Sequence, residues 1–160
     1  MLLTLISLAS AHPLDGVWVL DASEEEVRAT LDAATAAATS DFNFVIRPIA
    51  RQVLGRATNL CGQYTIAVDQ QFVLACDDKK PLVRPSDNTR VTVQPADGSD
   101  PFDTALSVED TSVQLQLYGE HGERRNVYAV DGDVLTMKAE ILSSFLDEPM
   151  TWTLAYRRRP

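Results

Sequence analysis

After Gln63, apolar and polar residues alternate with a period of two, and this feature limits most strongly how the chain can fold. In a β-strand, residues with this spacing lie on one face of the sheet. The runs that show it are Tyr64-Ile66-Val68, Phe72-Leu74-Cys76, Val91-Val93, Leu106-Val108, Val113-Leu115-Leu117, Leu135-Met137-Ala139-Ile141 and Trp152-Leu154-Tyr156. Turn-forming residues lie between the runs, at Asp97-Gly98, Glu109-Asp110, Gly119 to Gly122 and Asp131-Gly132. Connections this short join only antiparallel neighbours, so the sequence predicts a meander.

A meander of eight or more strands, each apolar on one face, buries that face most simply by curling into a closed barrel. We therefore expect an all-β, antiparallel up-and-down β-barrel. Its expected inward-facing side chains are Ile66, Leu74, Val91, Val93, Leu106, Val108, Leu115, Leu117, Met137, Trp152, Leu154 and Tyr156. Such an interior either lines a cavity for a mostly apolar ligand or is filled by its own side chains. The sequence leaves both alternatives open.

A helical insert over about 23–55 is predicted between a first strand, Asp15 to Leu20, and the alternating region. Ser23 and Glu26 have the spacing of a capping box, and acidic residues stabilise the positive end of a helix. Val27, Leu31 and Ala34 then follow at helical spacing, which predicts a first helix as far as about Ala38.

A second helix is predicted to begin near Ile46 or Arg47, because Pro48 is tolerated only in a first turn. The expected core-facing side of this helix consists of Ile46, Ile49, Val53 and Leu54, with Gly55 as a stop. Arg47, Arg51 and Arg56 form a basic strip. We interpret it as a solvated face or a counter-charge for the nearby glutamates, and the alternative is docking on an acidic partner or a membrane surface.

The first residues, 1–11, are typical of a signal peptide. Leu2 to Ala9 is apolar, and Ala9-Ser10-Ala11 resembles a cleavage site of small residues. The run is too short to cross a bilayer. We therefore expect residues 12–160 to form a single exported domain, periplasmic or secreted, without a transmembrane segment.

The two cysteines, Cys61 and Cys76, flank two alternating runs that can form a hairpin. A hairpin brings its ends within disulfide range, so we expect one disulfide, worth about 3 kcal/mol. Two buried free thiols are the alternative for a chain that stays in the cytoplasm. The net charge of −9 argues against nucleic acid and anionic membranes as main partners.

One strand, a helical pair and a meander that ends in a basic tail resemble the calycin group, which comprises lipocalins and fatty-acid-binding proteins. Gly16-Val17-Trp18 resembles the G-x-W of lipocalins, and the resemblance implies that a basic residue of the tail, Arg157, packs over Trp18. Residues 130–137, VDGDVLTM, are similar to the penultimate hairpin of fatty-acid-binding proteins. Bacterial exported lipocalin-like proteins have the most similar pattern. Leu154 replaces the arginine with which fatty-acid-binding proteins hold a carboxylate.

No nucleophile elbow, P-loop, HExxH motif or Cys/His pairing is present, so the sequence predicts no enzyme, no cofactor and no metal site. The expected function is binding of a small hydrophobic molecule, lipid or fatty-acid-like, by a monomer. The alternative is a filled barrel that acts as an envelope interaction or inhibitor module. Arg124 or Arg125 could turn inward to a ligand head group, although a solvated arginine is favoured. A remote alternative is copper held by an N-terminal His12 together with His121.

Overall fold

The computed structural model describes residues 11–58, 60–94, 100–120 and 122–160, and within them it contains ten strands and two helices. In chain order the elements are β1 (Gly16–Leu20), α1 (Glu24–Ala38), α2 (Arg47–Ala57), β2 (Gln63–Val68), β3 (Gln71–Cys76), β4 (Leu82–Pro85), β5 (Val91–Val93), β6 (Phe102–Val108), β7 (Ser112–Gly119), β8 (Gly122–Asp131), β9 (Val134–Ser143) and β10 (Met150–Arg158). Most of the predicted signal peptide, residues 1–10, and the predicted turn Asp97-Gly98 lie outside the described residues.

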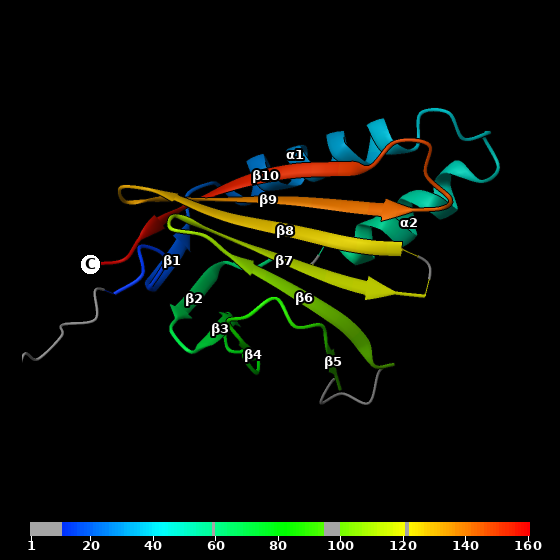
Figure 1. Ribbon diagram of the computed structural model, residues 1–160. Coiled ribbons are helices and arrows are strands. Elements are labelled where there is room, and N and C mark those ends of the chain that lie inside the picture. The colour runs from blue at the N-terminus through cyan, green and yellow to red at the C-terminus, as the bar shows by residue number, and fades with distance from the viewer. Residues whose placement is uncertain (1–10, 59, 95–99, 121) are drawn as a thin grey trace, which may run out of the picture.

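All ten strands form one antiparallel sheet with the order β4-β3-β2-β1-β10-β9-β8-β7-β6-β5. Each strand pairs with its neighbour in the chain, except that β1 pairs with β10 and that β4 and β5 are not paired with each other. The sheet therefore curls into a nearly closed barrel whose two edges, β4 and β5, face each other (Figure 1). The predicted up-and-down barrel, with two helices inserted after the first strand, is confirmed.

The predicted capping box begins α1: the Ser23 side chain accepts a hydrogen bond from the Glu26 amide, and the Glu26 carboxylate accepts one from the Ser23 amide. The helix lies along β10 (Figure 1). This position is available because β1 pairs with only the last part of β10, from Tyr156 onward. Val27 and Leu31 of α1 pack into the same apolar cluster as the barrel interior. Neither helix is long and apolar enough to cross a membrane, among the residues described.

The second helix, α2, begins where Pro48 allows it to begin, but its orientation differs from the prediction. Only Leu54 of the expected core-facing stripe is buried. Ile46, Ile49 and Val53 are exposed instead. Gly55 does not stop the helix, which ends at Ala57.

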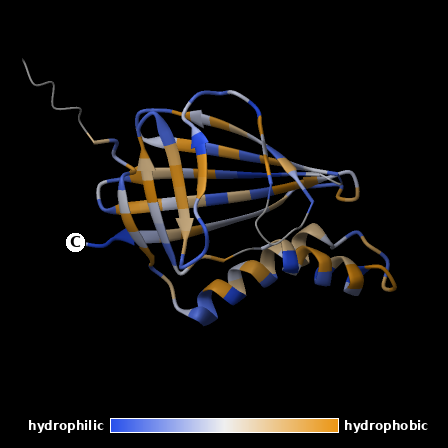
Figure 2. Ribbon diagram, turned by 90° about the horizontal axis from the view of Figure 1, so that it is seen from below, coloured by the Kyte–Doolittle hydropathy of each residue, from blue (hydrophilic) through white to orange (hydrophobic). Residues whose placement is uncertain are grey.

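Apolar and polar residues alternate in bands along the long strands (Figure 2), and burial alternates with them in β2 and β10. The half of the barrel nearer the β8–β9 turn, here called the closed half, is densely packed. Its fully buried side chains include Trp18, Ile66, Phe72, Val113, Leu135 and Tyr156. This packing supplies most of the core.

The closed end is covered by Arg158, which corrects the expectation that Arg157 packs over Trp18. The Arg158 guanidinium lies 4.2 Å from the centre of the Trp18 ring and donates to the carbonyl oxygens of Asp15 and Pro13. Arg157 lies on the outer face and pairs with Asp21. Alternation explains the difference, because Arg158 is two residues after the inward-facing Tyr156 and lies directly opposite Trp18.

A buried arginine bridges the seam between the unpaired edges β4 and β5. Arg84 of β4 is 1% exposed and donates hydrogen bonds to the Thr104 hydroxyl on β6 and to the Thr89 carbonyl oxygen. Thr104 in turn donates to the carbonyl oxygen of Val91 on β5. Side chains therefore join the two edges where no backbone ladder does.

Candidate functional site

A pocket of about 250 Å³ lies inside the barrel, beyond the packed closed half. Its lining consists of Cys61, Tyr64, Leu74, Cys76, Lys79, Lys80, Leu82, Phe102, Leu115, Leu117, Arg124, Asn126 and Tyr128. Three of these residues are cationic and none is acidic, in a protein whose net charge is −9. The volume is slightly below the range of about 300–1,000 Å³ that is typical of ligand pockets. The barrel is thus partly hollow and partly filled, between the two alternatives that the sequence left open.

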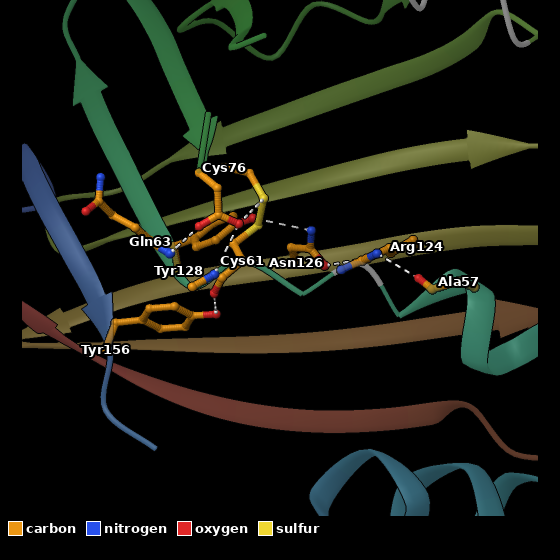
Figure 3. Close-up of a disulfide and its surroundings, with 10 residues drawn as sticks. Ala57, Cys61, Gln63, Cys76, Arg124, Asn126, Tyr128 and Tyr156 are labelled. Carbon is orange, nitrogen blue, oxygen red and sulfur yellow. Dashed lines mark hydrogen bonds between the residues drawn. A yellow bond between two sulfur atoms is a disulfide. The ribbon is translucent and has the colours of Figure 1, made fainter. Parts of the chain in front are cut away.

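Arg124 of β8 points into this pocket, contrary to the favoured expectation that it is solvated. Its Nε donates to the Asn126 side-chain oxygen at 3.0 Å, and its Nη1 donates to the carbonyl oxygen of Ala57, the last residue of α2, at 2.9 Å (Figure 3). The guanidinium carbon also lies 5.4 Å from the centre of the Trp152 ring. Arg124 therefore joins the pocket wall to the end of α2.

Three tyrosines lie together in the barrel interior, and two of them, Tyr64 and Tyr128, line the pocket. The Tyr64 ring centre is 5.4 Å from that of Tyr128 and 5.0 Å from that of Tyr156. Burial raises the pKa of all three phenols. They are therefore neutral over the physiological pH range and can donate hydrogen bonds.

The predicted disulfide between Cys61 and Cys76 is present, with Cα atoms 5.3 Å apart. Cys61 precedes β2, so the bond links the segment that follows α2 to the end of β3 (Figure 3). The Tyr156 hydroxyl donates to the Cys61 carbonyl oxygen, and the Asp77 carboxylate accepts from the backbone amides of Gly62 and Gln63. The segment at the pocket rim is thereby held at several points.

The residues predicted to face the interior occupy three kinds of position. Leu74, Leu115 and Leu117 line the pocket. Six others are buried in the core: Ile66, Leu106, Met137, Trp152, Leu154 and Tyr156. Val91, Val93 and Val108 are half-buried. Ligand contact by any of these side chains stays a prediction.

Sequence reasoning left the phase of β8 open, and the neighbouring turn could have settled it. Asp131 pairs with Val134 across Gly132 and Asp133, so Tyr128 lies opposite Met137 and Arg124 opposite Ile141. Cross-strand partners share a face, and the residues of β9 that include Met137 and Ile141 form the clear apolar series. Arg125 is consequently on the outer face, where it pairs with Glu123 and Glu140.

The copper alternative required His12 and His121, and His121 lies outside the described residues. The Nδ1 atom of His12 accepts from the Leu14 amide, and its Nε2 atom is 2.8 Å from the Glu109 carbonyl oxygen. Among the residues that the structure describes, Cys61, Cys76 and Asp77 form the one cluster with metal-ligand geometry. Both of its sulfur atoms are in the disulfide, which removes them as thiolate ligands.

Neither a comparison with protein-family models nor one with curated protein sequences finds a match. Solved structures do match in fold. A fatty-acid-binding protein of Schistosoma mansoni in complex with arachidonic acid has a TM-score of 0.55 and 16% identity, covering 92% of this chain and 97% of the other. A zebrafish ileal bile-acid-binding protein complexed with cholic acid has a TM-score of 0.51 and 8% identity over 92% and 99%.

An abundant heat soluble protein of Ramazzottius varieornatus has a TM-score of 0.57 and 12% identity over 92% of this chain and 96% of that one. These matches run along nearly the whole length of each partner. With ten antiparallel strands and two helices after the first, the chain has the fold of the fatty-acid-binding proteins within the calycin group.

Proposed function

We propose that this protein is a non-enzymatic binding protein for a small hydrophobic molecule that carries an anionic head group. The observation that supports this proposal is Arg124, a guanidinium on the wall of a mostly apolar pocket whose lining contains no carboxylate. A charged group in such a place gains most from an anion, because the low local dielectric strengthens their attraction. The matched fatty-acid-binding protein is in complex with arachidonic acid, and the matched bile-acid-binding protein is in complex with cholic acid. Both ligands are hydrophobic molecules that carry a carboxylic acid.

The ligand's apolar part would lie against Leu74, Leu115 and Leu117, and its head group would reach Arg124. Lys79 and Lys80, which follow β3, would attract the anion toward the pocket. Tyr64 and Tyr128, neutral phenols on the pocket wall, would offer hydroxyl groups to it without charge repulsion. Specificity would come from the shape of the small pocket together with this one guanidinium.

We further propose that the protein acts outside the cytoplasm. The disulfide supports this compartment, because such bonds persist in oxidising surroundings. The apolar segment Leu2 to Ala9, read as a signal peptide, agrees with it.

The second candidate is a module that acts through its surface in the cell envelope or as an inhibitor. The packed closed half of the barrel and the exposed apolar side of α2 favour it. A ligand-binding measurement separates the two candidates.

The test compares two adjacent arginines and two ligands of equal length, decanoic acid and decanol, by isothermal titration calorimetry. We expect the wild type to bind both ligands. Arg124→Gln should weaken decanoic acid binding at least about tenfold and leave decanol binding nearly unchanged, because only the acid uses the charge. Arg125→Gln, on the outer face, should change neither.

Equal loss of both ligands in Arg124→Gln would mean that the side chain has a structural role only. No binding of either ligand by the wild type, with no lipid retained in native mass spectrometry of protein from its own host, would leave the surface module as the function.

A further inference from the structure

The side of α2 that the sequence pattern assigns to the core faces solvent instead. Ile49, Val53 and Phe145 are 62%, 60% and 68% exposed, and Phe44 in the segment before α2 is 85% exposed. Here this surface, made up of Phe44, Val45, Ile46, Ile49, Val53 and Phe145, is named the α2 face. We propose that the α2 face is the interface of a symmetric dimer, and that a second copy of this chain covers it.

The orientation of α2 is fixed by its polar side. Arg47 donates to the carbonyl oxygens of Ser40 and Phe42, and Arg51 donates to the Thr39 hydroxyl, at the end of α1. A cationic side chain is favoured there, because the carbonyl end of a helix is negative. Turning the apolar side of α2 inward would break these hydrogen bonds. The contacts of the two arginines therefore keep the apolar side of α2 exposed.

The α2 face has both a groove and protruding side chains, which a two-fold interface requires. A groove of about 610 Å³ runs between α2 and the β9–β10 connection, and Ile46, Ile49, Val53 and Phe145 contribute to its walls. Figure 2 shows apolar residues along α2 and in the segment that leads into it. In a symmetric pair, the protruding Phe44 of each copy can enter the groove of the other, of which Phe145 forms part of the wall.

The α2 face offers apolar area to a second copy. Its two phenylalanines alone, at roughly 200 Å² each when fully exposed, expose on the order of 300 Å² at 85% and 68% exposure, and the four aliphatic side chains add to this area. A standard protein interface buries about 800 Å² per partner. Contiguous apolar patches larger than a few hundred Å² mark interaction sites.

Charge argues against an anionic membrane as the occupant. The lining of the groove includes Asp41 and contains no lysine or arginine. The whole chain carries a net charge of −9. Of the three arginines of α2, Arg47 binds the α1–α2 connection and Arg51 binds the C-cap residue Thr39, whereas Arg56 is exposed. Helices that lie on membranes usually direct cations toward the head groups. A concave groove also suits a protruding side chain better than a flat lipid surface.

The test is sedimentation velocity of the purified chain from low micromolar to high micromolar concentration. We expect the wild type to shift from monomer to dimer over this range. Val53→Asp and Phe145→Ser should each weaken the dimer at least about tenfold. Val83→Asp is the matched control, because Val83 is 48% exposed but lies on β4, outside the α2 face. Circular dichroism checks that all variants are folded.

A wild type that stays monomeric at the highest concentration would overturn the proposal, and so would a dimer that Val53→Asp leaves intact. If the monomer instead floats with phosphatidylcholine vesicles, and Val53→Asp abolishes flotation, the α2 face belongs to a lipid surface. The proposal requires no ligand in the barrel, so its outcome is independent of the calorimetric test above.

Discussion

Adjacent side chains in this barrel have opposite surroundings because strand residues alternate between its two faces. Arg124 lies in the pocket and Arg125 outside it, and Arg158 covers Trp18 while Arg157 pairs with Asp21. The sequence places two arginines at the end of the barrel, and the motif by itself does not indicate which of them packs over Trp18. Counting in steps of two from a clearly apolar neighbour, such as Tyr156, would have identified Arg158.

Replacement of these two arginines separates their roles. Arg158→Leu should lower the free energy of unfolding by about 2 kcal/mol, because it removes a cation–π contact and two hydrogen bonds to carbonyl oxygens. Arg157→Leu should lower it by less than about 1 kcal/mol, since its ion pair is exposed. Urea denaturation of both variants measures the difference. Equal losses would contradict the assignment of Arg158.

Gly16 has a specific part in this closure. Its φ is +139°, a backbone conformation that side-chain-bearing residues rarely adopt, and an added Cβ would lie 2.9 Å from the Arg158 Nη1 atom. The glycine of the G-x-W motif therefore makes room for the arginine that covers the tryptophan.

Helices and strands could be predicted from local pattern, whereas their orientations depended on tertiary contacts. The capping box of Ser23 and Glu26 located the beginning of α1, and Pro48 located that of α2. The periodicity of Ile46, Ile49 and Val53 also indicated a helix, but it could not show that Arg47 and Arg51 would bind the end of α1. Strand β4 was missed because its four residues, ending at Pro85, are too few for a period to be read.

The disulfide stabilises the connection between α2 and the β2–β3 hairpin. Its removal in the Cys61→Ser, Cys76→Ser double variant should lower the free energy of unfolding by about 3 kcal/mol, because the closed loop spans 15 residues. Urea denaturation measures the loss, and reduced wild-type protein is the control and should behave alike. A loss below about 1 kcal/mol would mean that Asp77 and Tyr156 hold the segment without the disulfide.

The whole barrel was predictable as an architecture, but the division of its interior was not. Alternation identifies which side chains point inward, whereas the volume that remains depends on how Trp18, Tyr128 and Tyr156 pack from different strands. The polar groups of the interior, Arg84 and Arg124, could not be found from hydropathy because they interrupt it. The burial of Arg84 and the inward position of Arg124 follow from register and from the contacts of distant segments.

Because of the tyrosine cluster, the free energy of unfolding of the whole molecule decreases at alkaline pH. Burial raises the pKa of Tyr64, Tyr128 and Tyr156 above the ordinary value of 10.0, whereas the unfolded chain titrates near that value. The stability is therefore complete below pH 10 and falls as the pH rises above it, because only the unfolded chain ionises.

Thermal unfolding at about pH 8 and about pH 11 measures this effect. Tyr128→Phe should make the alkaline fall in Tm shallower, because it removes one phenol whose pKa is raised by burial. Tyrosinate absorbance of the folded protein near pH 10 is a second measurement. Ionisation of all phenols at this pH, with an unaltered Tm, would contradict the prediction.

The seam closed by Arg84 has a mechanical consequence for the barrel wall. Elsewhere the circumference is fixed by backbone hydrogen bonds between neighbouring strands, and widening it there means breaking a ladder. Between β4 and β5 the described residues form no ladder, and the Arg84 guanidinium links the two edges through a hydroxyl and a carbonyl oxygen. We therefore expect the barrel wall to widen at this seam before it widens between strands that are joined by a ladder.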